Sequence, residues 1–264
     1  MSLKQNKYKV FVSTHKGRVR SENEDNFVFK KNIKRTGNEP QHLMLKEAKE
    51  PLLCAVFDGM GGENGGRQAS EISATIAVKY YHFLLQNGGA IADSIQDYIA
   101  TCNTQIKHFL SEHKLKRGGS TFAMIYFKDG IAQLFSMGDS RIYLYRNSAL
   151  LRISRDHTLA QKKYEANIFT KEEAESSTES HMLTRFLGMD EDSDEFRAEE
   201  YSAFRPEKDD KLLICSDGLY DMCSDREIAR ILSVPNQPYT IQLVEKALQN
   251  GGEDNITCMV IENA

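Results

Sequence analysis

Residues 53–62 read Leu-Cys-Ala-Val-Phe-Asp-Gly-Met-Gly-Gly, an apolar run that stops at Asp58 and a glycine-rich turn. The run predicts a buried strand that delivers one carboxylate to its end. Burial of an ionised carboxylate is costly unless a cation or hydrogen-bond donors compensate its charge. Asp58 therefore needs a partner.

The same succession of a strand and an acid occurs twice more along the chain. Asp139 follows the apolar run 131–137, and Asp217 follows the run that begins at Leu212. Each of these acids, like Asp58, stands where a buried strand should end. The three positions together suggest one acidic site.

Two acidic clusters could join that site: Asn-Glu-Asp at 23–25, and Glu-Asp-Asn at 253–255 just before a strand expected at 256–261. Acid–glycine pairs also form ordinary turns, and we interpret Asp129-Gly130, between two alternating strands, as a hairpin turn without chemistry. Acids at four strand ends are better explained by one carboxylate site than by independent turns. Carboxylate oxygens are ligands that suit magnesium or manganese.

The composition limits the class of protein. The 264 residues are 40% hydrophobic and contain no linker or low-complexity tract, so we expect a single domain over 1–264. No apolar stretch approaches the length of a membrane span and no signal peptide is visible, so we expect a cytoplasmic protein without a membrane partner. The net charge of −4 does not indicate the basic surface that binds nucleic acid. We expect a monomer.

The five cysteines are expected to be free thiols in a reducing setting. Cys54, Cys215 and Cys258 sit in apolar runs, where cysteine acts as a small hydrophobic residue. Cys215 lacks a basic neighbour in the sequence that would stabilise its thiolate, so a nucleophilic role is disfavoured. The seven histidines lack the i, i+4 spacing of a helical zinc site.

Apolar periodicity predicts strands and helices that come in groups. Strands are expected at 8–13, 26–30, before Asp58, at 121–127, 131–137 and 141–146, from 212, and at 256–261, and helices at about 69–83, 91–109, 155–167, from 170, from 224 and at 239–249. Thr170-x-x-Glu173 and Ser224-x-x-Glu227 are capping boxes. Because strands and helices do not alternate strictly, we expect an α+β fold with two sheets and helices outside them.

Three further segments are interpreted from their sequence. The polar, basic stretch 31–51 is expected to be a surface loop or ragged hairpin. The strands within 121–146 are expected to form an antiparallel meander. The acidic stretch 189–200 is interpreted as a solvated connection, which is the usual meaning of a charge run.

In their order along the chain, the motifs resemble the metal-dependent serine/threonine protein phosphatases of the 2C family, in their bacterial form. The segments that carry the resemblance are 17–25 (Gly-Arg-Val-Arg-Ser-Glu-Asn-Glu-Asp), 58–62, 118–121 (Gly-Gly-Ser-Thr), 137–143 (Met-Gly-Asp-Ser-Arg-Ile-Tyr), 155–159 (Arg-Asp-His-Thr-Leu), 183–188, 216–221 and 254–255. The resemblance implies a four-layer α-β-β-α sandwich of two antiparallel sheets. It also implies a small helical flap, inserted at about 156–188.

The resemblance implies a centre of two divalent metal ions, Mn²⁺ or Mg²⁺. Asp58 matches the carboxylate that bridges both ions, and Gly59 matches a ligand that acts through its backbone carbonyl. Asp217 and Asp254 match the acids that complete the shell of one metal ion.

Further residues match the family around this centre. Glu24 and Asp25 match acids that hold metal-bound waters. Asp139, together with Asp217, matches a third metal position of the bacterial members.

Arg20 matches the arginine that binds the substrate phosphate. The chemistry agrees, because a planar guanidinium can bind two phosphate oxygens at once. The alternative for Arg20 is a surface ion pair with Glu22 or Glu24.

The implied reaction is hydrolysis of phosphoserine and phosphothreonine in proteins, by attack of a water that bridges the two metal ions. The implied partners are phosphoproteins, the targets of a cognate serine/threonine kinase. Met60 stands where eukaryotic members carry a histidine that donates a proton, and we hypothesise that a metal-bound water takes this role. Two alternatives stay open: a catalytically silent module that binds a phosphoprotein or kinase, and a phosphatase for small phosphoesters.

Overall fold

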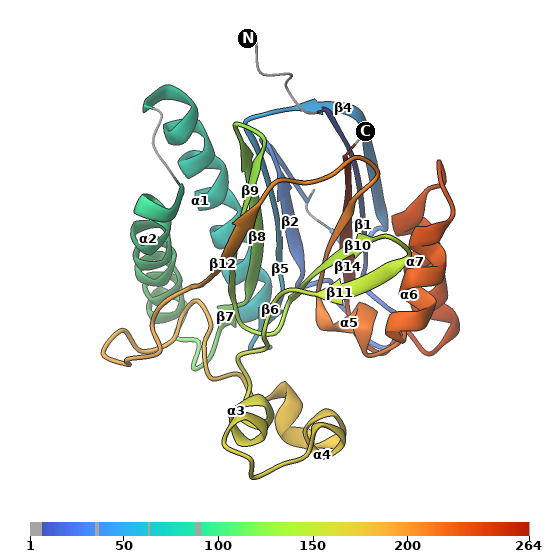
Figure 1. The fold of residues 1–264 in the computed structure, drawn as a ribbon. Helices are drawn as coiled ribbons and strands as arrows, with labels where there is room; N and C mark the ends of the chain where they lie inside the picture. Colours follow the sequence, from blue (N-terminus) through green and yellow to red (C-terminus); the bar gives the residue numbers. More distant parts are fainter. Residues whose placement is uncertain (1–6, 35–36, 63, 88–90, 264) are drawn as a thin grey trace.

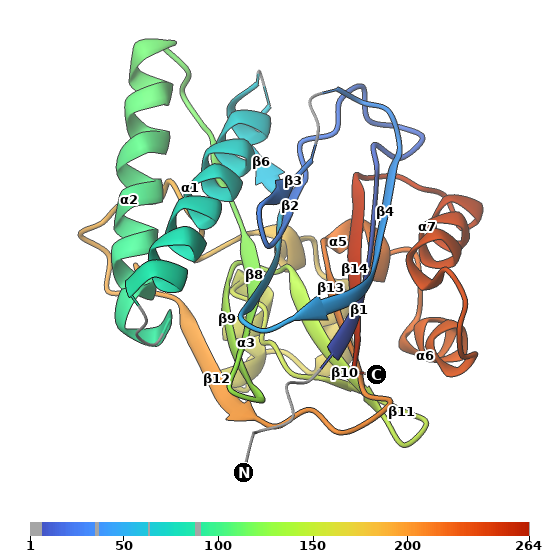
Figure 2. The same ribbon diagram turned by 90° about the horizontal axis from the view of Figure 1, so that it is seen from above.

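Two six-stranded antiparallel sheets face each other, and helices cover the outer face of each sheet (Figure 1). The computed structural model describes residues 7–34, 37–62, 64–87 and 91–263. Seen from above, the layers follow the order helices, sheet, sheet, helices (Figure 2). The predicted α+β sandwich is therefore confirmed.

The first sheet joins segments from both ends of the chain. Its strand order is β11 (Ala149–Arg152), β10 (Arg141–Arg146), β13 (Lys211–Cys215), β14 (Ile256–Asn263), β1 (Lys7–His15) and β4 (Gln41–Lys49). β1 and β14 lie side by side within it, which holds the two ends of the described chain together.

The second sheet carries the strand that leads to Asp58. Its order is β12 (Glu199–Phe204), β9 (Ile131–Met137), β8 (Phe122–Lys128), β5 (Leu52–Phe57), β2 (Asn26–Phe29) and β3 (Asn32–Ile33). A separate two-stranded ladder joins β6 (Gly59–Met60) to β7 (Gly119–Ser120), directly after Asp58.

The strand β5 is buried on both faces, which explains its unbroken apolar sequence. Leu53 and Phe57 pack toward the helices, whereas Cys54 and Val56 pack toward the other sheet. Because neighbouring residues of a strand point to opposite faces, both faces of β5 contribute to a core. Asp58 is the first residue beyond this buried segment.

Two pairs of helices cover the sandwich. They are α1 (Gly65–Asn87) and α2 (Ile91–Glu112) on the second sheet, and α6 (Asp225–Ser233) and α7 (Tyr239–Gln249) on the first (Figure 2). Buried apolar residues of all four helices pack on the sheets, whereas Phe83, which belongs to the stripe predicted for α1, is 54% exposed. None of the described helices is both long enough and apolar enough to cross a membrane.

Residues 156–188, the flap, lie below one end of the sandwich in Figure 1. They contain α3 (Leu159–Glu165), α4 (Lys171–Ser176) and the 3-10 helix η1 (Thr178–His181). The capping box at Thr170 is confirmed, as is the box at Ser224 that begins α6. The helix predicted over 155–167 begins later, because Thr158 is its N-cap and has an extended backbone conformation.

The prediction of a loop or ragged hairpin over 31–51 was wrong for most of its length. Residues Gln41–Lys49 form β4, which pairs along its length with β1 at the edge of the first sheet. Leu43 and Leu45 face the core while their neighbours face solvent. An edge strand with one solvent-exposed face contains few apolar residues, so its pattern is hard to recognise within a basic stretch.

The predicted meander over 121–146 was correct only for its first two strands. β8 and β9 pair through the hairpin at Asp129-Gly130, where both residues have positive φ. β10 instead crosses to the other sheet and pairs with β13. The crossing takes place at Gly138, whose φ of +111° is accessible to glycine.

The interpretation of 189–200 as a solvated connection was wrong in part. Glu195 forms an ion pair with Arg185 of the flap, and Glu199 begins β12 and contacts His157 with an Oε2···Nε2 distance of 2.9 Å. These acids are paired because the flap brings basic side chains onto them from outside the run.

Candidate metal centre

Two acids lie at the same end of the second sheet because of the register between its strands. β2 and β5 are antiparallel, and Asn26 pairs with Phe57. Asp25 precedes β2 and Asp58 follows β5, so each stands one residue beyond this pair. The end of one strand and the beginning of the other therefore bring the two carboxylates together.

Three acids gather at the neighbouring end of the first sheet in the same way. Arg141 pairs with Cys215, so Asp139, two residues before β10, and Asp217, two residues after β13, leave the sheet on the same side. Asp254 lies two residues before β14, which is the other neighbour of β13.

A cleft of about 560 Å³ opens at these strand ends. The predicted site residues on its wall are Arg20, Glu24, Asp58, Gly59, Asp217 and Asp254. Asp25 and Asp139 are 0% and 5% exposed, and they do not belong to its described lining. The structure thus brings all eight predicted residues to one end of the sandwich, six on the surface of the cleft and two buried near it.

The carboxylates of this cluster oppose one another's ionisation. Loss of hydration on burial, followed by the charges of Asp217, Asp25, Asp139 and Asp254, raises the pKa of Asp58 well above its usual value. The pKa of Asp217 is raised in the same way, by burial and then by Asp139 and Asp254. Divalent cations would relieve both the burial cost and the repulsion, so this donor set fits hard metal ions.

The hydrogen bonds of Asp25 also leave its carboxylate incompletely compensated. Its Oδ2 accepts a hydrogen bond of 2.8 Å from Ser216, whereas its Oδ1 is buried without a partner in the described part of the chain. Burial is the main reason that the pKa of Asp25 is raised to about 6. A buried acceptor without a donor is costly, and a water held at a metal centre would supply one.

Lys34 is a cation that the sequence analysis missed. It is 8% exposed, and its Nζ donates a hydrogen bond of 2.6 Å to the backbone oxygen of Asn23. Burial lowers its pKa to about 8, while the charge of Asp25 acts in the opposite direction. Because Lys34 stands in a basic stretch, its sequence gives no signal of burial.

Gly59 has no room for a side chain. A Cβ atom at this position would lie 2.3 Å from the backbone oxygen of Gly66 and 2.5 Å from that of Glu24. The glycine therefore lets the turn after Asp58 lie against both the start of α1 and the segment of Glu24.

Asn255 was part of a predicted motif but received no role. Its side-chain nitrogen donates hydrogen bonds to the backbone oxygens of Lys16 (2.9 Å) and Glu22 (2.8 Å), and its oxygen accepts one from the backbone nitrogen of Glu24 (2.7 Å). It thus holds the loop of Arg20 against the start of β14.

Arg20 stands at the open side of the cleft, with its side chain 59% exposed. Its Nη2 lies 2.7 Å from Oδ2 of Asp254, and this hydrogen bond raises the pKa of the guanidinium. The suggested ion pair with Glu22 or Glu24 was wrong about the partner, and Glu22 instead lies 3.6 Å from Arg67.

His181 of the flap also reaches the cleft, and the sequence analysis missed it. Its Nδ1 lies 3.9 Å from Oδ2 of Asp217 and 4.0 Å from Oδ2 of Asp221. The three side chains could share a metal ion, since their ligand atoms all lie within 4.8 Å of one another. Histidine spacing gave no signal, because the flap brings together residues far apart in the sequence.

Comparisons with known proteins agree with this geometry. The family model of protein phosphatase 2C matches residues 38–259. The protein phosphatase PhpP of Streptococcus pneumoniae is 31% identical over 234 residues, which cover 86% of this chain and 92% of the relative. The chain therefore belongs to the protein phosphatase 2C family, a family of enzymes.

Solved structures show the same fold. The serine/threonine phosphatase PstP/Ppp of Mycobacterium tuberculosis superposes with a TM-score of 0.80 and 27% identity, covering 97% of this chain and 99% of that one. The catalytic domain of PstP in complex with two manganese ions superposes with a TM-score of 0.75 and 27% identity, covering 97% of this chain and 98% of that one.

The buried acid Asp139 gives a test of the carboxylate repulsion. Burial, and next the charge of Asp156, raises its pKa from 3.8 to about 7 in the folded protein. Between these two pH values the folded state binds more protons at this site than the unfolded state, so the contribution of Asp139 to stability falls as pH rises.

We expect EDTA-treated Asp139→Asn to gain stability relative to the wild type as pH rises from about 4 to about 7, by at least about 1 kcal/mol. Thermal unfolding of both proteins across this range measures the difference. A stability difference that does not change with pH would contradict the raised pKa of Asp139.

Proposed function

We propose that this enzyme hydrolyses phosphoserine and phosphothreonine in proteins, with residues 1–264 acting as one catalytic domain and 156–188 as its flap. The observation that carries the proposal is the cleft where Asp58 and Asp217 repel each other beside the exposed guanidinium of Arg20. Divalent cations would compensate the negative charge of such a site, and the exposed guanidinium can bind a phosphate. The similarity to PhpP and PstP supports the same reaction.

In this proposal, Mn²⁺ or Mg²⁺ ions occupy the cleft beside Asp58. Asp58 and the carbonyl of Gly59, with Asp217 and Asp254, are the direct ligands. Oxygen donors of this kind suit both cations, and the related PstP domain was solved with two manganese ions.

Three other acids complete the proposed centre. Glu24, half-buried on the wall of the cleft, and the buried Asp25 hold water at the centre. Asp139, with Asp217, would serve a third ion. The raised pKa of Asp139 supports this, because burial and neighbouring charges leave its ionised form poorly compensated.

Bound divalent cations would neutralise the phosphate charge and lower the pKa of a water, so that it can attack phosphorus. The chain supplies the rest of the chemistry. Arg20 exchanges Asp254 for two phosphate oxygens and sets the orientation of the phosphoryl group. Met60 lines the cleft but has no proton to donate, so the proposal assigns no protein side chain as the acid for the leaving oxygen.

The proposed partners are phosphoproteins that a cognate serine/threonine kinase has modified. We also propose that the enzyme acts as a monomer in the cytoplasm. All five cysteines are buried free thiols, which suits a reducing compartment.

Hydrolysis of a phosphothreonine peptide tests the proposal against a catalytically silent binding module. We expect phosphate release with Mn²⁺, none with EDTA, and a loss of at least about 100-fold in Asp217→Asn because a direct ligand is removed. Asp192→Asn is the matched control, since Asp192 is exposed outside the cleft. Absence of release from wild type in Mn²⁺ would favour the silent module, and equal release from small phosphoesters would favour a broader phosphatase.

The role of Arg20 is tested by Arg20→Lys. A lysine keeps the charge but cannot bind two phosphate oxygens, so we expect KM for the phosphopeptide to rise about tenfold. Arg18→Lys is the control, because Arg18 is exposed in the same loop and is not among the described residues of the cleft wall. A KM equal to that of the control would show that Arg20 does not hold the phosphate.

A further inference from the structure

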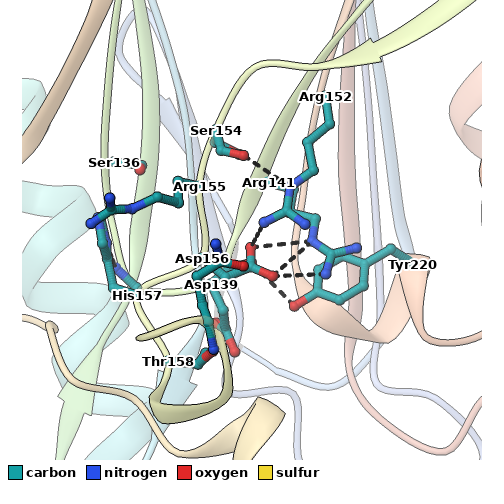
Figure 3. A network of polar contacts seen from close by, with 12 residues as sticks. Ser136, Asp139, Arg141, Arg152, Ser154, Arg155, Asp156, His157, Thr158 and Tyr220 are labelled. Carbon is teal, nitrogen blue, oxygen red and sulfur yellow. Dashed lines mark hydrogen bonds and ion pairs between the residues drawn. The ribbon is translucent and has the colours of Figure 1, made fainter. Parts of the chain in front are cut away.

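Asp156, at the base of the flap, is a buried acid with two arginine partners (Figure 3). Its side chain is 11% exposed. Arg141 donates to it from Nε (3.2 Å) and Nη2 (2.7 Å), and Arg152 forms a second ion pair with it. A buried carboxylate is stable only when its charge is well compensated, and here two guanidinium groups compensate one acid.

Arg141 connects this acid to the segments of both Asp139 and Asp217. It stands two residues after Asp139, and its guanidinium carbon lies 3.4 Å from the centre of the Tyr220 ring. Tyr220 belongs to α5 (Asp217–Tyr220), the short helix that begins at Asp217. The hydroxyl of Tyr220 donates a hydrogen bond of 3.1 Å to the backbone oxygen of Asp139.

His157, the next residue of the flap base, holds the other side of the same turn. Its backbone nitrogen donates to the oxygen of Gly138 (2.9 Å), and its Nδ1 accepts from the nitrogen of Gly138 (3.0 Å). In the neutral ring the proton is then on Nε2, which faces Oε2 of Glu199 at 2.9 Å. Asp139 therefore lies between Tyr220, which donates to its backbone oxygen, and His157 of the flap base, which holds the neighbouring Gly138.

We infer that Asp156, Arg141 and Tyr220 are positioning residues, which tie the base of the flap to the backbone segments that carry Asp139 and Asp217 and thereby set the affinity of the cleft for divalent cations. This inference rests on the proposed metal centre. None of the three side chains belongs to the described lining of the cleft, so each acts through the segments that it holds.

The geometry explains why these particular residues are needed. Only a guanidinium can donate to Asp156 in two directions while its flat face lies on Tyr220. Residues that orient metal ligands typically change metal affinity by about 10- to 100-fold when they are mutated. A merely structural ion pair of equal burial would lower stability without changing metal affinity.

The same strand offers such a pair as a control. At the far end of β10, Arg146 donates to Asp210 from Nε (2.9 Å) and Nη2 (2.6 Å). Asp210 is 2% exposed, so Asp210→Asn removes a buried charge of the same kind as Asp156→Asn does. The two acids differ in where their arginine partners stand: Arg141 begins β10 near the cleft, and Arg146 ends it.

The test is calorimetric titration of the full chain with Mn²⁺ alone, with thermal unfolding of the metal-free samples measured alongside. For Asp156→Asn we expect the Kd for Mn²⁺ to rise about 10- to 100-fold, whereas Asp210→Asn should lower the unfolding temperature and leave the Kd unchanged. Trypsin cleavage within the flap should increase in Asp156→Asn only. Equal Mn²⁺ affinity of the two variants would overturn the inference.

Tyr220→Phe keeps the test decisive if Asp156→Asn does not fold. It removes only the hydroxyl that holds the backbone of Asp139, and we expect weaker Mn²⁺ binding with little change in unfolding temperature. Wild-type affinity in Tyr220→Phe would then overturn the inference. If wild type itself binds no Mn²⁺, the proposed metal centre fails and the inference falls with it; if wild type binds and the variants match it, only the inference is wrong.

Discussion

Mutual repulsion among acids at the meeting ends of two sheets is the constraint on which the rest of the structure depends. Strand register brings Asp58 to Asp25 in one sheet and Asp217 to Asp139 in the other, and the packing of the two sheets keeps the carboxylates from moving apart. A hydrogen bond from Ser216 and the charge of Lys34 offset part of the cost of burying Asp25. The remainder is what divalent cations would offset, so folding and metal binding are linked through the same carboxylates.

The two sides of the cleft are built differently. The carboxylates come directly from the ends of packed strands, where the core fixes their positions. Arg20 and His181 come from a loop and from the flap, and their side chains are 59% and 58% exposed. The carboxylates are therefore more firmly held than the exposed side chains of Arg20 and His181.

Much of this arrangement could be predicted from the sequence, because strands buried on both faces leave unbroken apolar runs with an acid at the end. The run before Asp58 and the hairpin at Asp129-Gly130 are local signals of this kind. β4 was missed because its outer face is polar, and the crossing at Gly138 was missed because sheet membership depends on distant strands. The burial of Lys34 is set by tertiary contacts that leave no pattern in its neighbours.

Metal binding at the strand ends is best measured by an anomalous difference map, recorded at the manganese absorption edge from crystals grown with Mn²⁺. We expect two peaks beside Asp58, one of which also contacts Asp217 and Asp254. If the protein hydrolyses phosphopeptides but its crystals show no peak at these carboxylates, the proposed metal centre is wrong.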